Sequence, residues 1–178
     1  MFESMYPLMR ELVLPLVLIL VEYFTGVSIS PEILGTTEAN LSADEVVVSR
    51  VVDGDTIKVV GEDNKEMTVR LVGVDTPEMA NFGEEEECFA QAAKMFLVEQ
   101  IETKIVKLEA DTKQPNEDRY GRLLRHVYFQ DKLMNEELVS QGFAKVYINA
   151  ESKNSEQLLI LQEQARIENK GLWRECQE

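Results

Sequence analysis

The sequence predicts an α+β fold in which five β-strands form a small closed or nearly closed barrel with helices set among them. Short segments rich in valine and isoleucine recur along residues 44–178, with polar turns between them, and apolar residues at helical spacing occur between and after these segments. The chain has 178 residues, of which 44% are hydrophobic, which is enough to bury the core of one domain of ordinary size.

The strands follow one another in two groups. The first three form an expected meander, in which the polar turn GEDNK separates the second strand from the third. The polar loop TKQPNEDRYGR separates the last two. The five strands are expected at Glu45–Val52, Thr56–Val60, Met67–Val74, Ile105–Ala110 and Leu123–Phe129. A further short β-like segment is expected at Ala144–Ile148.

Three helices are expected. The first covers Glu84–Gln100, because apolar residues recur there at helical spacing and four glutamates at its start suit the helix dipole. The second covers Met134–Gln141 and is closed by Gly142. The third covers Ser155–Asn169, with Gly171 just past its end.

The amino end differs from the rest of the chain. Residues 12–21, LVLPLVLILV, are uninterrupted apolar sequence. A membrane-spanning helix needs about 20 such residues, whereas a signal-peptide core needs roughly 7–15. We therefore expect a signal peptide or membrane anchor at 1–24, with membrane association through residues 5–24. A helix buried in the domain is the alternative. Residues 25–43 have few charges and are expected to form a flexible linker to a domain at 44–178.

Composition excludes several kinds of site. The formal net charge of −15 argues against binding of nucleic acid through bulk charge. The chain has one histidine, His126, which nearly excludes Ser-His-Asp chemistry and His-rich zinc sites. Residues 44–178 carry 17 basic and 28 acidic residues, but residues 103–132 carry 7 basic and 5 acidic. Any binding of phosphate is therefore expected to be local, weak and sensitive to salt.

Two acidic residues stand where a strand ends or is interrupted. The run VVDGDTIKVV breaks a valine-rich stretch at Asp53-Gly54-Asp55, although Asp and Gly are poor strand residues, and Asp75 follows the third strand. Two neighbouring carboxylates repel each other unless a cation lies between them. Hard oxygen ligands select Ca²⁺ or Mg²⁺, and the backbone carbonyl of Thr76 is a candidate third ligand.

Two arginines and a glutamate complete a site for phosphodiester hydrolysis. Arg70 and Arg122 suit a phosphate, because the planar guanidinium offers paired donors. Glu78 is the candidate base that orients or deprotonates a water molecule. A cation, two arginines and a carboxylate together provide charge neutralisation and an activated water.

Each motif also has a purely structural interpretation. Asp-Gly-Asp can form a plain turn, Asp-Thr-Pro-Glu an ordinary loop, and Tyr-Gly-Arg a hairpin corner, while Arg70 can face solvent. Arg70 and Asp75 are also an odd number of residues apart, so strict alternation would place them on opposite faces. The strand must end or kink near Gly73 for both residues to share a site.

The chain resembles the staphylococcal-nuclease-like, or thermonuclease, family from about Val46 to Trp173. The segments VVDGDTIKV, VRLVGVDTPE, DRYGRLLRHVY, MNEELVSQGFAKVY and KGLW carry the resemblance, in family order and at family-like spacing. The resemblance implies an OB-fold, a five-stranded barrel with three helices. It also implies a Ca²⁺-dependent endonuclease that cuts DNA and RNA and leaves 3′-phosphate ends.

The same resemblance implies a role for each matched residue. Asp55, Asp75 and the carbonyl of Thr76 would bind calcium. Arg70 and Arg122 would hold the phosphate and its developing charge, with Glu78 as the base. Substrate contacts would come from Arg119 and Tyr120, with Tyr147 near a tyrosine that stacks on the base.

Two other functions are alternatives to a nuclease. Some nuclease-like domains lack the catalytic set and serve as nucleic-acid or protein binding modules, with weak catalysis or none. A secreted OB-fold binder of oligosaccharide or peptide is the third interpretation, but it gives no reason for the acids and arginines to coexist. The complete catalytic set favours the enzyme, which we expect to be a monomer.

The two cysteines give an indication of the cellular compartment in which the protein works. Cys88 lies near the start of the first expected helix and Cys176 near the carboxyl end. A disulfide between them would close a loop of nearly the whole domain, and disulfides persist outside the reducing cytosol. Together with the leader this predicts an extracytoplasmic protein, secreted or membrane-anchored. Two separate thiols are the alternative.

Overall fold

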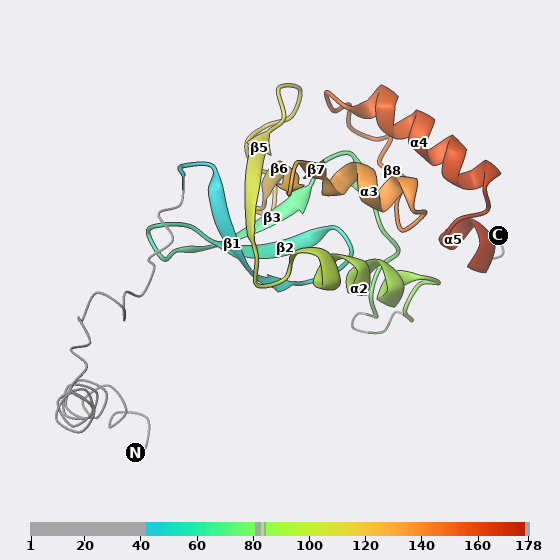
Figure 1. The fold of residues 1–178 in the computed structure, drawn as a ribbon, viewed down its shortest axis with the longest axis horizontal. Helices are drawn as coiled ribbons and strands as arrows, with labels where there is room; N and C mark the ends of the chain where they lie inside the picture. The colour runs from blue at the N-terminus through green and yellow to red at the C-terminus, as the bar shows by residue number, and fades with distance from the viewer. Residues whose placement is uncertain (1–41, 81–82, 84, 177–178) are drawn as a thin grey trace, which may run out of the picture. The chain divides into compact units, whose positions relative to one another are not determined.

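The computed structural model describes residues 42–80, 83 and 85–176, which belong to one unit of the chain, Leu41–Glu178. This part of the chain is an α+β fold with a five-stranded mixed β-barrel and four helices (Figure 1). The predicted leader at 1–24 and nearly all of the predicted linker at 25–43 lie outside the described residues. Among the residues that are described, no helix is long and apolar enough to cross a membrane.

The barrel is built from antiparallel neighbours and closed by one parallel pair. In spatial order its strands are β3, β2, β1, β5 and β6, and a parallel pairing of β3 with β6 closes the circle. The bounds are Glu45–Val51 for β1, Thr56–Val60 for β2, Glu66–Leu71 for β3, Ile105–Ala110 for β5 and Leu123–Phe129 for β6. Each of the five predicted strands therefore has a counterpart, although the third ends at Leu71 and not at Val74 as predicted.

Three very short strands complete the β-structure of the described residues. β7 (Lys132–Leu133) extends the edge of β6, while β4 (Val74–Asp75) pairs with β8 (Lys145–Val146) in a separate two-stranded sheet. The predicted strand Met67–Val74 is thus divided in two. The division lies at Gly73, whose φ of +78° is a left-handed conformation that suits glycine and ends the extended run.

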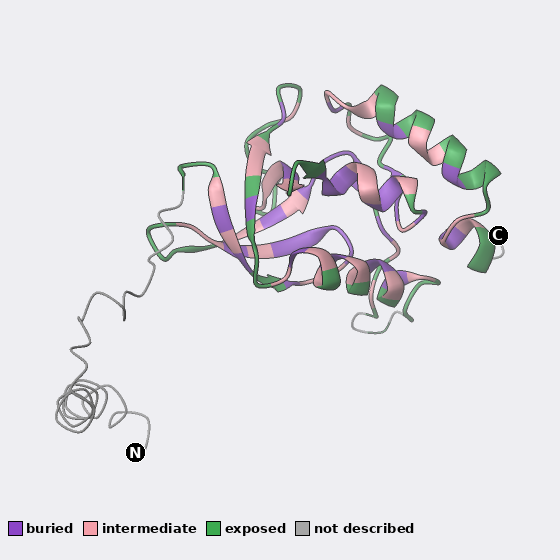
Figure 2. Cartoon of the chain, in the orientation of Figure 1, coloured by how far each residue is buried: buried purple, intermediate pink, exposed green. Residues whose placement is uncertain are grey.

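The barrel interior is filled by alternate residues of the strands. Val46 and Val48 of β1, Ile57 and Val59 of β2, and Val69 and Leu71 of β3 are buried, as Figure 2 shows in purple along the strands. Residues two apart on a strand face the same side, so each strand presents one apolar row to the core. Burying one such side chain contributes about 1.5–3 kcal/mol, which makes these rows the main source of the barrel's stability.

Four helices of the described residues lie outside the barrel. Their bounds are Ala90–Ile101 for α2, Met134–Ser140 for α3, Ser155–Ile167 for α4 and Leu172–Glu175 for α5. Figure 1 shows α2 along the lower side of the barrel, and α4 outside α3. The sequence predicts three helices, and α5 is an additional, single-turn helix that this prediction missed.

The first helix was predicted to start at Glu84, six residues before its actual start at Ala90. Glu85–Glu87 precede the helix instead of forming its first turn. Phe89, with a φ of +75°, has a left-handed conformation that a right-handed helix cannot include, so α2 begins only at Ala90. The predicted effect of these glutamates on the helix dipole is therefore wrong.

The carboxyl end is attached to the domain at two points. The backbone N–H of Leu172 donates to the carbonyl of Gly142 at 2.8 Å, and a side chain on Gly142 or Gly171 would collide with the backbone of the other segment. Beyond α5, the structure joins Cys176 to Cys88 in a disulfide. The last helices are therefore held against the turn after α3 and against the segment that precedes α2.

Two buried polar groups fasten the outer elements to the barrel. Asp111 accepts hydrogen bonds from the backbone N–H groups of Lys113 and Lys153, and its Oδ2 lies 2.7 Å from His126 Nε2. Burial acts to raise the pKa of Asp111, but these hydrogen bonds outweigh it and lower that pKa. Because Lys153 lies just before α4, the buried carboxylate ties that helix to β5 and β6.

Asn135 of α3 provides the second connection, and its removal tests it. Its Oδ1 accepts from the backbone N–H of Val127, and its Nδ2 donates to the carbonyl of Val72 at 2.8 Å. Asn135→Ala leaves two buried backbone groups without partners, so we expect the free energy of unfolding to fall by about 2–5 kcal/mol. Urea denaturation measures this. The exposed Gln141→Ala at the end of the same helix is the control, and an equal loss in both variants would contradict the account.

Candidate active site

Strand register places Asp55 beside Arg70. Thr56 of β2 pairs with Arg70 of β3, and the backbone N–H of Leu71 donates to the carbonyl of Asp55 at 2.8 Å. The side chain of Asp55 is only 6% exposed, and its Oδ2 forms an ion pair with Arg70 Nη1. A buried carboxylate needs such a partner, because desolvation of an unpaired charge is costly.

Thr76 provides the other partners of Asp55. Its backbone N–H and its hydroxyl donate to Asp55 Oδ2 at 3.1 and 3.0 Å, so one carboxylate joins the start of β2 to the segment after β4. The turn before Asp55 is closed by its own backbone N–H, which donates to Asp53 Oδ1. The interruption of the valine run therefore positions a buried carboxylate.

Gly54 permits this packing. A Cβ at position 54 would lie 2.7 Å from Thr76 Oγ1 and 2.8 Å from the Cβ of Ala93 on α2. The turn thus lies directly against both the Thr76 segment and the first long helix, at a distance that only glycine allows.

The turn at Gly73 brings Asp75 back to Arg70. Arg70 Nη2 donates to Asp75 Oδ1 at 3.2 Å, so a single guanidinium contacts both carboxylates. The prediction that the strand must end near Gly73 for these residues to meet is confirmed. The same turn positions Tyr147, whose backbone N–H donates to the carbonyl of Gly73 at 3.0 Å.

Two acids near Arg70, Asp75 and Glu78, have raised pKa values. Burial raises the pKa of Asp75, and the charge of Asp55 raises it further, against the opposing effect of Arg70. The pKa of Glu78, which is exposed but partly desolvated by its neighbours, is also raised, first by this partial burial and then by the charges of Asp55 and Asp53. Arg70 does not neutralise this group of carboxylates, which is therefore an attractive site for an additional cation.

A tight turn, closed by Asp118, positions the second arginine, Arg122. Asp118 accepts hydrogen bonds from the backbone N–H groups of Tyr120 and Arg122, and Arg122 Nε donates to its other oxygen at 2.7 Å. Burial acts to raise the pKa of Asp118, but these hydrogen bonds from the backbone and side chain of Arg122 and from Tyr120 lower it. The carboxylate of Asp118 thus orients the Arg122 guanidinium.

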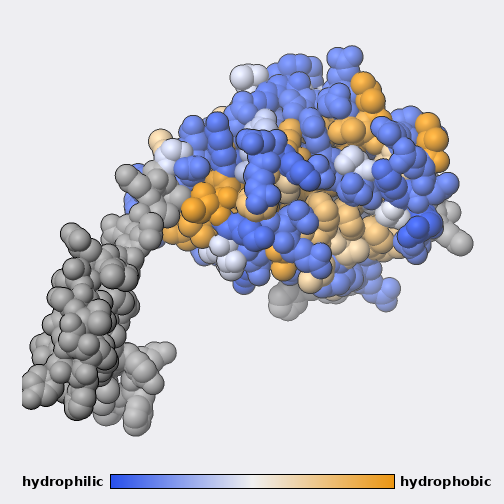
Figure 3. Space-filling view, in the orientation of Figure 1, coloured by the Kyte–Doolittle hydropathy of each residue, from blue (hydrophilic) through white to orange (hydrophobic). Residues whose placement is uncertain are grey.

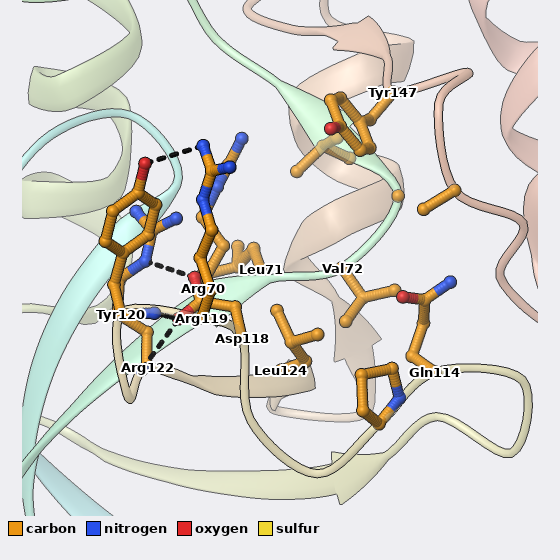
Figure 4. A pocket seen from close by; sticks show the side chains of 14 residues that line it. Arg70, Leu71, Val72, Gln114, Asp118, Arg119, Tyr120, Arg122, Leu124 and Tyr147 are labelled. Carbon is orange, nitrogen blue, oxygen red and sulfur yellow. Dashed lines mark hydrogen bonds and ion pairs between the residues drawn. The ribbon is translucent and has the colours of Figure 1, made fainter.

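The closing pair of the barrel brings this turn to Arg70. Arg70 of β3 pairs with Leu124 of β6, two residues after Arg122. A cavity of about 490 Å³ lies there, and Figure 4 shows Arg70, Arg119 and Arg122 grouped on one side of it with Tyr147 on the other. Aliphatic side chains also line it, namely Leu71, Val72, Val74 and Leu124. A cavity with arginines at one side and apolar walls suits a phosphate attached to a flat, apolar group.

Tyr120 lies among the arginines. Arg119 Nη2 donates to the Tyr120 hydroxyl at 2.7 Å, and the guanidinium carbons of Arg119 and Arg122 lie 4.8 and 5.5 Å from its ring centre. The residue is 68% exposed, so it forms part of the open rim of the cavity.

The structure brings most of the predicted site residues together. Arg70 contacts Asp55 and Asp75 and also lines the cavity, and Glu78 is close enough for its pKa to respond to all three. Arg119, Tyr120, Arg122 and Tyr147 line the same cavity. In the described part of the chain, no three His, Cys, Asp or Glu side chains converge closely enough to hold a metal ion by themselves.

Sequence reasoning missed two residues at this site. Asp118 begins the segment DRYGRLLRHVY, and no role was predicted for it, although an Asp shortly before a Tyr-Gly pair is a signal for a turn closed by its side chain. Glu87 pairs with the backbone of Glu78 at 2.9 Å, and nothing in the run of four glutamates distinguishes it.

One face of the domain is mostly hydrophilic. Figure 3 shows hydrophilic residues over most of the visible face, interrupted by separate apolar patches. Exposed apolar residues include Leu159, Ile160 and Ile167, all on α4. The arginines of the cavity are therefore a local basic region on a chain whose net charge is −15.

In comparisons with known proteins, residues 68–175 match the family model described as "Staphylococcal nuclease homologue". The chain is 33% identical over 140 residues to the thermonuclease of Staphylococcus hyicus, covering 78% of this chain and 80% of that protein. It is 32% identical over 136 residues to the thermonuclease of Staphylococcus intermedius, covering 76% and 79%. It is also similar to endonuclease YncB of Bacillus subtilis, at 33% over 130 residues, covering 72% and 61%.

Gly54→Ala tests the packing that positions Asp55. The added methyl group must displace Thr76 or α2, so we expect the free energy of unfolding to fall by about 1–3 kcal/mol. Gly61→Ala is the matched control, because a Cβ there has no neighbour closer than 3.6 Å. Urea denaturation of both variants measures the effect, and equal stability of the two would show that the turn does not need glycine.

Proposed function

The chain belongs to the staphylococcal nuclease family, and from that membership we propose that it is a Ca²⁺-dependent endonuclease that hydrolyses phosphodiester bonds of DNA and RNA. The products would carry 3′-phosphate ends, and residues 44–178 would form the OB-fold nuclease domain. The relatives named thermonuclease and endonuclease support nuclease activity as the general function.

One observation carries the proposal: Arg70 connects the carboxylates to the cavity. Its guanidinium contacts Asp55 and Asp75, and the same side chain lines the cavity that Arg119 and Arg122 share. A phosphate seated beside these arginines would lie next to the carboxylates. Hydrolysis of a phosphodiester needs this arrangement, in which charge neutralisation and water activation occur at one phosphorus atom.

The carboxylates fit a hard divalent cation. Asp55 and Asp75 offer oxygen ligands, their negative charge exceeds what Arg70 neutralises, and the Thr76 carbonyl follows Asp75 directly in the chain. Ca²⁺ takes about 6–8 oxygen ligands, so water and a substrate oxygen would complete the set. When bound, the ion would neutralise phosphate charge and increase the acidity of a nearby water.

The arginines would hold the phosphate. Arg122 is oriented by Asp118 through its Nε, and its terminal Nη groups make no hydrogen bond to the described part of the chain. Arg70 and Arg122 together would offer several donors to the non-bridging oxygens. Such preformed donors stabilise the negative charge that develops in the transition state.

Glu78 would act as the general base. Partial burial and the charges of Asp55 and Asp53 raise its pKa, and a carboxylate with a raised pKa accepts a proton more readily. Its exposed position beside the acid group would let it contact a water molecule.

The remaining cavity residues would bind the nucleotide. Arg119 would contact a further phosphate, with Tyr120 beside it, and Tyr147 on the opposite side would stack on a base. Stacking on an aromatic ring tolerates any base and is worth about 1–3 kcal/mol, which fits an enzyme that accepts both DNA and RNA.

The protein would work outside the cytoplasm, as a secreted or membrane-anchored monomer. The disulfide between Cys88 and Cys176 supports this location, because disulfides persist in oxidising compartments. The apolar run at 12–21 agrees with it as the core of a signal peptide or anchor within residues 1–24, with residues 25–43 as the linker.

The direct test is cleavage of single-stranded DNA by the purified protein with Ca²⁺ and with a chelator. The proposal predicts fragments with 3′-phosphate ends in Ca²⁺ alone. Binding without cleavage under both conditions would favour a nuclease-like binding module instead.

Glu78→Gln tests the general base. The amide keeps the size of the side chain but cannot accept the proton, so we expect kcat to fall by about 10²–10⁴-fold. The melting temperature should not fall, because the side chain is exposed. Glu85→Gln, an exposed acid in the segment before α2, is the control for the charge change. Near wild-type turnover in the Glu78→Gln variant would remove Glu78 from the mechanism.

A further inference from the structure

Glu78 lies in a segment without helix or strand, and Glu87 fixes its backbone. The N–H of Glu78 donates to Glu87 Oε2 at 2.9 Å, and the N–H of Glu87 donates to the carbonyl of Glu78 at 3.0 Å. The two residues thus form a closed hydrogen-bonded ring across nine positions of the chain. Glu87 sets the orientation of the peptide groups from which the Glu78 side chain extends.

Local contacts hold Glu87 only in part. It is exposed and precedes α2, and the backbone N–H of Ala90, the first residue of that helix, donates to its carbonyl at 3.1 Å. Hydrogen bonds between exposed groups compete with water and hold a segment weakly. A covalent, long-range constraint next to Glu87 therefore adds to what keeps it beside Glu78.

The disulfide supplies this constraint. Cys88, the residue after Glu87, is bonded to Cys176, which is 88 positions away in the sequence. Cys176 follows α5, and α5 is attached to the domain through Leu172, which is 5% exposed and donates its N–H to Gly142. The C-terminal helix thus anchors the segment that orients Glu78.

We propose that Glu87 is a positioning residue for Glu78, and that the Cys88–Cys176 disulfide holds Glu87 in the place where it does so. The inference rests on the proposed function, since it takes Glu78 as the general base. Cys88 is exposed, so a reductant can reach the bond in the folded protein. Reduction should therefore lower turnover while substrate binding through the arginines continues.

Three single variants separate positioning from charge. Glu87→Ala removes the acceptor for the Glu78 N–H, Glu87→Gln keeps an acceptor oxygen without the charge, and Glu86→Ala removes a neighbouring exposed acid. With single-stranded DNA and saturating Ca²⁺, we expect Glu87→Ala to lower kcat by about 10- to 100-fold with little change in KM, as small misplacements of a catalytic group do. Glu87→Gln should keep most of the turnover, and Glu86→Ala all of it.

Replacement of both cysteines tests whether the disulfide holds Glu87 in place. The double variant Cys88→Ser and Cys176→Ser should lose turnover by a similar factor, measured well below its melting temperature. Adding Glu87→Ala to the double variant should lower turnover little further, because the effects of changes that disrupt the same set of interactions are not additive. The wild-type protein treated with a reductant should match the double variant, which should not respond to the reductant.

A readout that does not depend on activity accompanies the kinetics. Hydrogen exchange of the Glu78 amide should be slow in the wild type and in Glu87→Gln, and fast in Glu87→Ala and in the serine pair. Wild-type turnover or unchanged exchange in Glu87→Ala would overturn the inference and leave the proposed function intact. Equal losses in Glu87→Gln and Glu87→Ala would also overturn it, because Glu87 would then act through its charge. Absence of cleavage by the oxidised wild type would defeat the proposed function itself, and the inference with it.

Discussion

The ion pair between Asp55 and Arg70 is the contact on which the candidate site depends. Both side chains are largely withdrawn from water, at 6% and 14% exposure, so neither charge is tolerable there without the other. Asp55 also accepts from Thr76, and Arg70 also contacts Asp75. Two parts of the chain, the turn that holds Asp55 and the segment from Arg70 to Thr76, are therefore held around one pair of charges, and Arg70 also lines the cavity that Arg119 and Arg122 share.

The barrel makes this pair possible. The antiparallel pairing of β2 with β3 places Asp55 beside Arg70, and the parallel pairing of β3 with β6 brings the Arg122 turn to the same end. The core of valine, isoleucine and leucine fixes both registers, because a shift of one residue would turn the apolar rows outward. The geometry of the candidate site thus relies on the packing of the barrel core, of which Leu71 also lines the cavity.

Much of the fold follows from local pattern, and so does the choice of Asp55, Asp75, Arg70, Arg122 and Glu78 as candidate site residues, whereas Arg119, Tyr120 and Tyr147 were implied only by the family resemblance. The five barrel strands are recognisable because valine-rich runs alternate with polar turns, and the odd spacing of Arg70 and Asp75 predicts the break at Gly73. The start of α2 could not be predicted, since a run of glutamates looks like a good first helical turn. Its actual position depends on the left-handed Phe89 and on a disulfide partner near the other end of the domain. The role of Glu87 could not be predicted from the sequence for the same reason, because only tertiary structure distinguishes it from its three neighbouring glutamates.

The central claim is that these carboxylates hold more negative charge than Arg70 neutralises and bind a calcium ion that completes the site. Calorimetric titration of Ca²⁺ into the wild-type protein and into Asp75→Asn tests it most directly, because Asp75 is half-exposed and its replacement should leave the fold intact. The account predicts one calcium site per chain in the wild type and a large loss of affinity in the variant. Absence of binding in the wild type, or equal affinity in both proteins, would contradict it.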